Sequence, residues 1–425
     1  MLYFKENKLN MKELYDYIII GAGITGVTLA RLLDQKGYKI CVLESDSVAG
    51  GLCRTKKIAD HYLDIGGGHF FYSKYNDVYD FVFSHMPESE FNYFDRVSKI
   101  RLGDEIIDYP VESSLWQLNI ENQVKYLISV VRAGESSSKA EPKNYQEWIK
   151  WKLGDLIAEN YMLPYNRKIW GVEPSEMDVD WLTKIPRLDV EEIIRYSLEK
   201  RNGVDKYPSH PGFYYPKEGG FQKIFDSIYS KVKNCVKLSE PVVNLKLENN
   251  MWIVNEKYSA KYVLNTAPWN SLFDALGKPN ELKADFKNLI TNSIVVSLFK
   301  ENVDNDWHWL YIPDENVPQH REFFIHNFSE SSARDGVYTE TNRKRWLEGG
   351  NFKRKNTHAI FEHIIDNAYP IPVIGHSKSA NKIIEYYRDR NLIGIGRWGQ
   401  WQYLNSDVCI KYAIDFVNSI KNETN

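Results

Sequence analysis

The first hydrophobic run of the chain, Tyr-Asp-Tyr-Ile-Ile-Ile at residues 15–20, ends directly at a glycine. A short apolar run with such a stop is typical of a buried strand. Residues 26–36 then place apolar side chains at helical spacing, and Gly37 follows them as a helix-ending glycine would. A second apolar run occupies residues 39–43. The start of the chain therefore predicts a β-α-β unit with two parallel strands.

Helical spacing dominates the next part of the chain, between residues 76 and 200. The clearest helical patterns cover residues 122–133, 145–160 and 189–200. Residues 136–142 are rich in Ser, Lys and Glu and predict an exposed loop. This region therefore predicts a mostly helical insertion.

Strand-like alternation returns later, and it completes the predicted architecture. The pattern predicts strands within residues 240–265 and 290–328, a last strand at 391–396 and a last helix at 406–420. The fold class is α/β: a Rossmann-like nucleotide-binding domain, a mostly helical insertion and an antiparallel-sheet substrate domain. The expected domains are a discontinuous nucleotide-binding domain (15–75, 208–268 and 375–425), a mostly helical domain (76–200) and a mixed β-sheet substrate domain (269–374 with parts of 90–115).

Composition narrows the class of protein. The 425 residues allow two or three domains, and 43% hydrophobic with 26% charged residues are ordinary values for a soluble globular enzyme. These values exclude a disordered, collagen-like or disulfide-scaffold protein. The formal net charge of −3 gives no general attraction to nucleic acid or to an anionic membrane, so no nucleic-acid partner is expected.

The cysteines and the longest apolar runs indicate the compartment. Four cysteines occur without a Cys-x-x-Cys pair, so no structural zinc or other metal site is expected. Free thiols in a long chain suit a reducing cytosol, and we expect a cytoplasmic protein. No apolar run approaches 18 residues, so neither a membrane span nor a signal peptide is expected.

The turn after the first strand has the pattern Gly-x-Gly-x-x-Gly. Gly21 permits a tight turn, Gly23 lets the backbone approach a pyrophosphate, and Gly26 allows the helix to pack closely on the strand. Ile24 and Thr25 then open a helix whose N-terminal N–H groups suit a phosphate. Glu44, followed by Ser45, ends the second strand 18 residues after the last glycine, where a carboxylate can bind a ribose diol. Together these features predict a dinucleotide site.

A second glycine pair favours FAD over NAD. The segment Gly50-Gly51-Leu52-Cys53-Arg54-Thr55 resembles the FAD-binding amine oxidase-like superfamily. The resemblance implies that Gly50, Gly51 and Leu52 approach the flavin diphosphate and that Arg54 neutralises it. It also implies an adenine site completed by a strand at residues 240–243, through Val242. A turn before the last helix would complete the flavin site with Gly396, Arg397, Tyr403 and Asn405.

Five further segments, in chain order, resemble the UDP-galactopyranose mutases, especially the eukaryotic type. They are LDIGGGHFF (63–71), PYNRKIW (164–170), WLYIPDENVPQHR (309–321), AYPIP (368–372) and GRWGQWQYLN (396–405). The resemblance implies a flavin-dependent pyranose–furanose mutase acting on a nucleotide-diphosphate sugar. In that family N5 of reduced FAD attacks the anomeric carbon, so NADPH or NADH is expected as a transient reductant.

The same resemblance assigns roles to individual residues. Gly68 and His69 would lie beside the flavin, and phenols and a guanidinium would hold the leaving diphosphate. The implied catalytic residues are His69, Arg321, Tyr311, Tyr369 and Tyr403. Sugar and diphosphate would contact Asn166, Trp170, Trp309, Arg321, Tyr311, Tyr369 and Tyr403.

Two departures from the family pattern leave the substrate open. Ile185 stands where the mutases carry a second diphosphate arginine, and Lys184 and Arg187 are its neighbours. In the uridine-binding segment, Val111 and Glu112 stand where the family has phenylalanine and an amide. The sequence therefore does not decide the base or the sugar, and a carboxylate at Glu112 would also suit the N1–H and N2–H groups of guanine.

Two other functions remain as alternatives. An FAD-dependent oxidase or desaturase of the same superfamily would need an apolar cage, where this sequence has arginine and tyrosine. A non-enzymatic relative of the GDP dissociation inhibitor type would bind no flavin, against which the intact Gly50, Gly51 and Arg54 argue. The oligomeric state is left undecided by the sequence.

Overall fold

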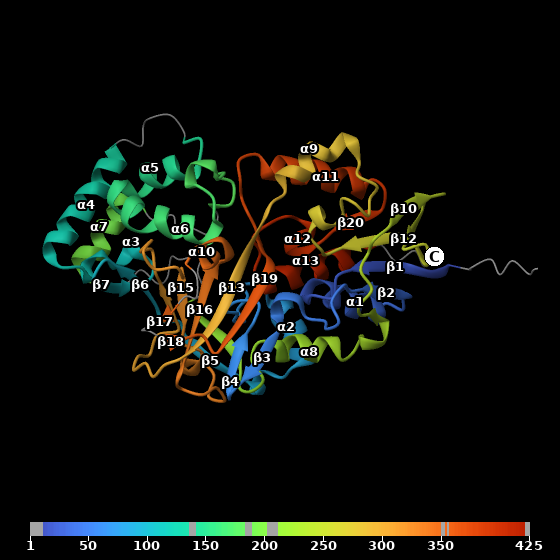
Figure 1. Cartoon of the computed structure of the whole chain (residues 1–425), viewed down its shortest axis with the longest axis horizontal. Helices are drawn as coiled ribbons and strands as arrows, with labels where there is room; N and C mark the ends of the chain where they lie inside the picture. Colours follow the sequence, from blue (N-terminus) through green and yellow to red (C-terminus); the bar gives the residue numbers. More distant parts are fainter. Residues whose placement is uncertain are drawn as a thin grey trace, which may run out of the picture. The chain divides into compact units, whose positions relative to one another are not determined.

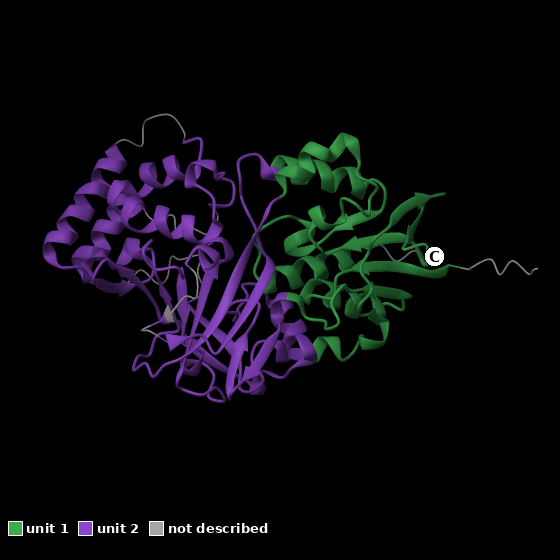
Figure 2. Cartoon of the chain, in the orientation of Figure 1, with its two compact units in different colours: residues 1–51, 227–289, 378–425 green, residues 52–226, 290–377 purple. Residues whose placement is uncertain are grey.

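The chain folds into two compact units built from discontinuous segments (Figure 2). The structure, a computed structural model, describes residues 12–135, 142–182, 189–201, 211–349, 353–354 and 357–420. Unit 1 contains residues 1–51, 227–289 and 378–425, and unit 2 contains residues 52–226 and 290–377. No helix among the described residues is both long and apolar enough to cross a membrane.

Unit 1 is built on a seven-stranded sheet with the order β10-β11-β12-β1-β2-β9, in which β20 also pairs with β12. Strands β1 and β2 run parallel, as the sequence predicts, and β12 and β20 extend the parallel part. The strands are β1 (Glu13–Ile20), β2 (Ile40–Leu43), β9 (Val236–Lys237), β10 (Leu245–Glu248), β11 (Met251–Val254), β12 (Tyr258–Asn265) and β20 (Leu392–Gly394).

Helices cover this sheet because its central strands are apolar on both faces. The last four residues of β1 and all of β2 are buried, which requires a covering layer on each side. Helix α1 packs against α13 in the same unit (Figure 1). The helices that lie wholly or partly in unit 1 are α1 (Ile24–Gln35), α8 (Gln222–Tyr229), α9 (Lys283–Asn288), α11 (His376–Arg388), α12 (Gly396–Gly399) and α13 (Ser406–Ser419).

The strand predicted at residues 240–243 is wrong. The strand in this region is β9, which ends at Lys237 and pairs with β2, and residues 240–244 are irregular. Ser239 has a φ of 54°, which turns the chain, and Pro241 lacks the N–H that a central ladder needs. Val242 instead packs against the core of unit 1.

Unit 2 contains a second seven-stranded sheet, with the order β19-β13-β16-β15-β14-β6-β7. All its pairs are antiparallel except β14 with β6. The strands are β6 (Ser98–Leu102), β7 (Glu105–Asp108), β13 (Thr291–Lys300), β14 (Trp309–Tyr311), β15 (Arg321–Phe323), β16 (Gly336–Asn342) and β19 (Phe361–Pro370). A two-stranded sheet is formed by β17 (Lys353–Arg354) and β18 (Thr357–His358).

The helices of unit 2 gather mainly between residues 111 and 199 (Figure 1). Helices α4, α5 and α7 occupy the three ranges with helical spacing, and α7 begins with a capping box between Asp189 and Glu192. The loop predicted at residues 136–142 lies almost entirely outside the described residues. The helices are α2 (Asn76–His85), α3 (Val111–Ser114), α4 (Ile120–Glu135), α5 (Tyr145–Ile157), α6 (Leu163–Trp170), α7 (Val190–Glu199) and α10 (Arg343–Glu348).

The division into units differs from the expected domains in several ways: residues 269–289 group with unit 1, and the expected helical and substrate domains otherwise fall within unit 2. Residues 52–75 and 211–226 group with unit 2 rather than with the nucleotide-binding part. The reason is pairing with distant segments: Phe71, which follows the hairpin of β3 (Thr55–Ile58) and β4 (His61–Asp64), forms a bridge with Tyr214. Tyr214 lies on β8 (Gly212–Pro216), which pairs with β5 (Phe91–Asp95). Pairing between strands more than 100 residues apart leaves no local pattern in the sequence.

Gly23 and Gly26, at the start of α1, differ in the space around them, and this difference tests whether the close packing of helix on strand requires glycine. A Cβ at Gly26 would lie 1.9 Å from the carbonyl oxygen of Gly21, whereas a Cβ at Gly23 would meet nothing within 4 Å. We expect Gly26→Ala to destabilise the protein by about 1–3 kcal/mol or more, because the strand and helix must separate. Gly23→Ala, the matched control, should unfold at the wild-type denaturant concentration when both proteins are free of FAD. Equal unfolding midpoints for both variants would contradict this account.

Candidate functional site

The glycine turn of unit 1 leaves backbone, not side chains, at the N-terminus of α1. Gly21 has a φ of 97°, and its N–H donates to the carbonyl of Leu43 at 2.9 Å. No side chain caps the helix at Gly23, and the first turn holds no acidic residue. The N–H groups of this turn are therefore placed to meet an anion, as the motif predicts.

Glu44 is fixed at the end of β2 by the same turn. Its Oε2 accepts the N–H of Ala22 at 2.7 Å, and its Oε1 accepts the N–H of Asp46 at 2.9 Å and the hydroxyl of Ser45 at 3.2 Å. A carboxylate has about four acceptor positions, so one position, on Oε2, remains for a hydroxyl of a diol. The arrangement fits the ribose-binding role predicted for Glu44.

The second glycine pair lies directly against the first turn. The N–H of Gly50 donates to the carbonyl of Ala22 at 3.0 Å, and a Cβ at Gly51 would lie 3.5 Å from the Cα of Gly23. Gly50 and Gly51 both have positive φ, of 123° and 52°. Two side-chain-free turns in contact form a backbone surface of the kind that a dinucleotide diphosphate requires.

The turn before α13, at residues 396–405, also contains a glycine with positive φ that packs closely on a neighbouring segment. Gly396 has a φ of 77°, and a Cβ there would lie 2.4 Å from the hydroxyl of Thr25, so this turn packs on α1. Arg397 donates to the carbonyl of Leu404 from Nε at 2.9 Å and from Nη2 at 2.6 Å. Its guanidinium lies 5.8 Å from the ring centre of Tyr403, and Asn405 precedes α13. The predicted residues of this segment thus come together within unit 1.

Three residues of the predicted anion site meet on the sheet of unit 2. Tyr311 on β14 and Arg321 on β15 are register partners, so their side chains share one face of the sheet. Nη2 of Arg321 donates to the Tyr369 hydroxyl at 3.3 Å. One guanidinium and two phenols therefore form the group that the resemblance assigns to the diphosphate.

A fully buried carboxylate holds Arg321 in this position. Oε2 of Glu340, on β16, accepts Nε of Arg321 at 2.6 Å and Nε2 of His320 at 3.2 Å. Burial alone would raise the pKa of Glu340, but the charge of Arg321 and the bonds from both partners outweigh it and lower the pKa to about 2. Burial lowers the pKa of His320 to about 4, so its imidazole is neutral at pH 7.

The loop at residues 66–69, which we call the glycine–histidine loop, is held at several points. Nδ1 of His69 lies 2.6 Å from the carbonyl oxygen of Gly67, and its ring centre lies 5.1 Å from that of Phe221. The N–H of Gly68 donates to Oε1 of Glu340 at 3.2 Å. Leu52 and Arg54 lie in unit 2 beside this loop: a Cβ at Gly66 would meet the Leu52 carbonyl, and the Arg54 carbonyl accepts the N–H of residue 65.

Asn166 is hydrogen-bonded to Trp170, and Trp170 in turn contacts the ring of Tyr369. Nδ2 of Asn166 donates to the Tyr145 hydroxyl at 2.7 Å and to the Met162 carbonyl at 2.8 Å, and its Oδ1 accepts Nε1 of Trp170 at 3.0 Å. The Trp170 ring centre lies 5.9 Å from that of Tyr369. Since both Asn166 donors are already used, the amide orients Trp170 rather than offering donors to a sugar.

Trp309 shares the face of β14 with Tyr311 but is only 1% exposed. Its ring stacks on Phe328 at 5.4 Å between centres, and it contacts the ring of Phe213. This packing makes Trp309 part of the aromatic core below the site. Sequence analysis assigned it to the substrate because it precedes Tyr311 in the matching segment.

Two charged residues of this site were missed by sequence analysis. Nη2 of Arg96 donates to the Tyr311 hydroxyl at 2.8 Å, with the guanidinium 5.2 Å from the Tyr109 ring centre. Glu340 was missed as well. Glu340 lies in a polar Thr-Glu-Thr-Asn run, and only the structure shows that the strand carrying this run is buried throughout. Arg96 precedes β6, and no sequence pattern marks it either.

Glu112, singled out as a departure from the family pattern, is enclosed in the helical part of unit 2. It is 1% exposed, and neither carboxylate oxygen has a hydrogen-bond partner. Burial therefore raises its pKa to about 7. The titratable groups coupled to it are the phenols of Tyr145 and Tyr161. The neutral acid is thus the form favoured below pH 7. The other departure from the family pattern, Ile185 with its neighbours Lys184 and Arg187, lies outside the described residues.

The raised pKa of Glu112 predicts a pH-dependent stability. In the unfolded chain this carboxyl ionises near 4.5 and in the folded protein near 7, so its contribution falls as the pH rises from 4.5 to 7. The difference corresponds to about 3 kcal/mol. Glu112→Gln should therefore gain stability relative to the wild type at pH 8 and match it more closely at pH 5, measured by urea unfolding. A constant difference across this range would contradict the buried neutral acid.

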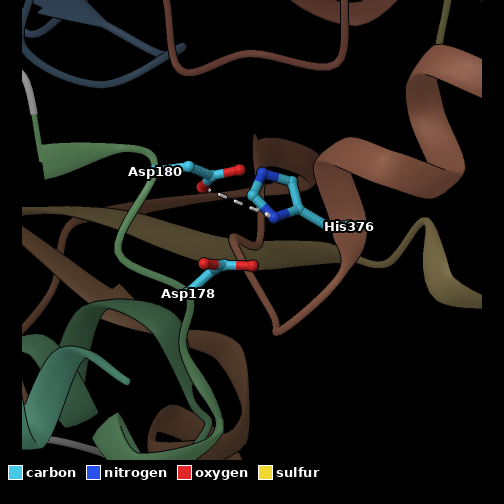
Figure 3. A group of neighbouring side chains, drawn as sticks. All are labelled: Asp178, Asp180 and His376. Atoms are coloured by element: carbon cyan, nitrogen blue, oxygen red, sulfur yellow. Dashed lines mark ion pairs between the residues drawn. The ribbon is translucent and has the colours of Figure 1, made fainter. Parts of the chain in front are cut away.

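Three possible metal ligands come together in unit 2 (Figure 3). Asp178, Asp180 and His376 place ligand atoms within 4.8 Å of one another. Two of them already have structural partners: Asp178 accepts the N–H of Gly375 at 2.9 Å, and Nδ1 of His376 lies 2.9 Å from the carbonyl oxygen of Val373. These hydrogen bonds give the cluster a structural role: it holds the segment after α6 against the start of α11.

Comparison with known families supports the nucleotide-binding part first. A family model described as an NAD(P)-binding Rossmann-like domain matches residues 19–83. This range contains the glycine turn, Glu44, the second glycine pair and the glycine–histidine loop.

Similarity to known mutases covers nearly the whole chain. A dTDP-fucopyranose mutase of Escherichia coli is 22% identical over 414 residues, 94% of this chain and 96% of that protein. A probable UDP-galactopyranose mutase of Klebsiella pneumoniae is 23% identical over 424 residues, 96% of each protein. The resemblance inferred from the five segments is thus confirmed.

Solved structures show the same fold. The crystal structure of a reduced UDP-galactopyranose mutase matches with a TM-score of 0.83, at 22% identity, over 95% of this chain and 93% of that chain. A putative protoporphyrinogen oxidase from Exiguobacterium matches with a TM-score of 0.71 at 14% identity, over 96% and 98%. The predicted α/β class with a Rossmann-like domain is therefore confirmed.

Proposed function

We propose that this protein is a flavin-dependent mutase that interconverts the pyranose and furanose forms of a nucleotide-diphosphate sugar. The observation that carries the proposal is the group formed by Arg321, Tyr311 and Tyr369, with the glycine–histidine loop bonded to the same carboxylate. Similarity to mutases over 94–96% of the chain supports it. The mutases compared act on uridine- and thymidine-diphosphate sugars by name, so a pyrimidine nucleotide is the first substrate class to test.

The residues of unit 1 fit FAD as the cofactor. Gly21, Gly23, Gly50 and Gly51 offer a backbone surface for its diphosphate, and Glu44 is fixed for its ribose. Reduced FAD would supply the nucleophile, its N5 atom, for the anomeric carbon. A second Gly-x-Gly-x-x-Gly pattern, at residues 394–399, follows β20, but its turn packs on α1 beside the first one. NADPH or NADH would therefore visit transiently as the reductant.

The residues of unit 2 would stabilise the negative charge of the departing nucleoside diphosphate. Arg321 presents a planar fork of N–H donors, and the hydroxyls of Tyr311 and Tyr369 add two more donors near it. Because Glu340 and Arg321 form a preorganised pair, these donors need little reorganisation when the anion forms. Trp170 packs against Tyr369 and would limit the space for the sugar ring.

The oxidase alternative has weaker support. A putative protoporphyrinogen oxidase and a putrescine oxidase of this fold share 14% and 12% identity with the chain, which supports the fold alone. An oxidase of amines or isoprenoids needs an apolar cage, whereas this face carries Arg321 and Arg96 beside hydroxyl groups. Oxygen consumption with an amine, without isomerisation of any sugar nucleotide, would favour this alternative.

The direct test is an anaerobic isomerisation assay. Purified protein, with and without dithionite, is mixed with UDP-, dTDP- and GDP-sugars, and the products are separated by HPLC. We expect a new peak of equal mass only with reduced flavin, and its identity names the base and the sugar. A yellow protein that isomerises none of these sugars would contradict the proposal.

Replacing Arg321 tests the anion site. We expect Arg321→Ala to weaken binding of the isomerised sugar nucleotide by about 2–4 kcal/mol, because a buried diphosphate loses its charged partner. Calorimetric titration measures this change. Arg343→Ala is the matched control, because Arg343 is a more exposed arginine of the same unit paired with Asp366. Unchanged affinity in Arg321→Ala, or equal loss in both variants, would remove Arg321 from the site.

Replacing His69 tests the glycine–histidine loop. We expect His69→Ala to keep FAD, seen in its visible absorbance, and to lose isomerase activity, because the loop no longer presents an imidazole. His358→Ala, which changes an exposed histidine on β18, should keep both. A fully active His69→Ala variant would exclude a catalytic role for this side chain.

A further inference from the structure

Glu340 is the point at which two parts of the proposed site meet. Its Oε2 accepts from Arg321 and from neutral His320, and its Oε1 accepts the N–H of Gly68 at 3.2 Å. The contact with the loop is close: a Cβ at Gly67 would lie 2.6 Å from Oε1. One carboxylate therefore contacts both the guanidinium assigned to the substrate anion and the glycine–histidine loop.

We propose that Glu340 is a positioning residue that couples the glycine–histidine loop to the anion-binding guanidinium of Arg321. The proposal rests on the mutase function for its effect on turnover, but the coupling itself is a property of the structure. Glu340 touches neither a reacting atom nor a cofactor atom on this reading; it acts through Arg321 and through the backbone of Gly68.

The physical reason for coupling is that the carboxylate is shared. Glu340 is fully buried, so no water replaces a hydrogen bond that it loses. A diphosphate bound to Arg321 competes with Glu340 for the same positive charge and weakens that pair. The charge left on the carboxylate then strengthens its bond to the Gly68 N–H, and occupancy of the anion site tightens the loop that carries His69.

Glu322 offers a matched comparison on the neighbouring strand. It is 1% exposed and also pairs with an arginine, since Nη2 of Arg354 lies 3.1 Å from its Oε2. Its Oε1 accepts Nε2 of Gln319 at 3.0 Å, and no hydrogen bond joins it to the glycine–histidine loop among the described residues. A role that comes from burial and ion pairing alone would be shared by both glutamates, whereas coupling belongs to Glu340.

The test combines kinetics with amide exchange in the FAD-loaded protein. In Glu340→Gln we expect kcat to fall at least about tenfold, because the loop is no longer held. The Kd for UDP should stay equal or become lower, because a negative charge beside the diphosphate is gone. Amide exchange of residues 66–71 should slow on addition of UDP in the wild type and should not respond in this variant. Glu322→Gln should keep the wild-type UDP response and kcat.

A second variant keeps the proposal testable if Glu340→Gln is poorly folded. Glu340→Asp retains the charge and shortens the side chain, so we expect faster exchange of the loop with UDP affinity within about twofold of the wild type. A loop that still responds to UDP in both Glu340 variants would overturn the coupling, as would equal effects in Glu322→Gln. The exchange and UDP measurements need no turnover, so they remain decisive even when no sugar is isomerised.

Discussion

The buried ion pair between Arg321 and Glu340 is the constraint on which the proposed site depends. A carboxylate with no exposed surface is stable as an anion only beside a cation and further donors, and Arg321 and His320 supply both. The pair fixes the guanidinium at the face shared with Tyr311 and Tyr369. It also fixes the backbone of Gly68, so the geometry of the loop and of the anion-binding face have one origin.

The two units position their groups by different means. In unit 1 backbone conformation positions the N–H groups, because the turns at Gly21, Gly50 and Gly396 have positive φ and closely approach neighbouring segments. In unit 2 networks of buried aromatic and charged side chains position the guanidinium and the phenols. Backbone turns suit a cofactor diphosphate of constant shape, whereas side-chain networks are able to respond to an anion that leaves and returns.

Aromatic residues make up 14% of the chain, and several of them pack together around the proposed site in unit 2. Trp309 stacks on Phe328, Tyr165 contacts both Tyr311 and His320, and Trp170 bridges Tyr369 and Trp181. These rings exclude water around the arginine and the phenols, which strengthens every electrostatic interaction there. Trp309, Phe328 and Trp181 therefore support the proposed site through packing.

The sequence by itself determined the β-α-β start, the helical region, the glycine turns and the segments that carry His69, Tyr311, Arg321 and Tyr369. These features are local, because periodicity, glycine spacing and short motifs are each read within a few residues. The tertiary structure decided the grouping of residues 52–75 and 211–226 with unit 2, which depends on pairing across more than 100 residues, of Phe71 with Tyr214 and of β5 with β8.

Tertiary packing also decided which polar groups meet. Nothing near Glu340 or Arg96 in the chain indicates that they contact Arg321 and Tyr311, because those contacts arise only when β14, β15 and β16 align and Arg96 reaches across. The same is true of Glu112, whose raised pKa comes from enclosure by helices distant in sequence. Burial and partner choice are properties of the folded chain, and they set the charge and hydrogen bonding on which the proposed chemistry depends.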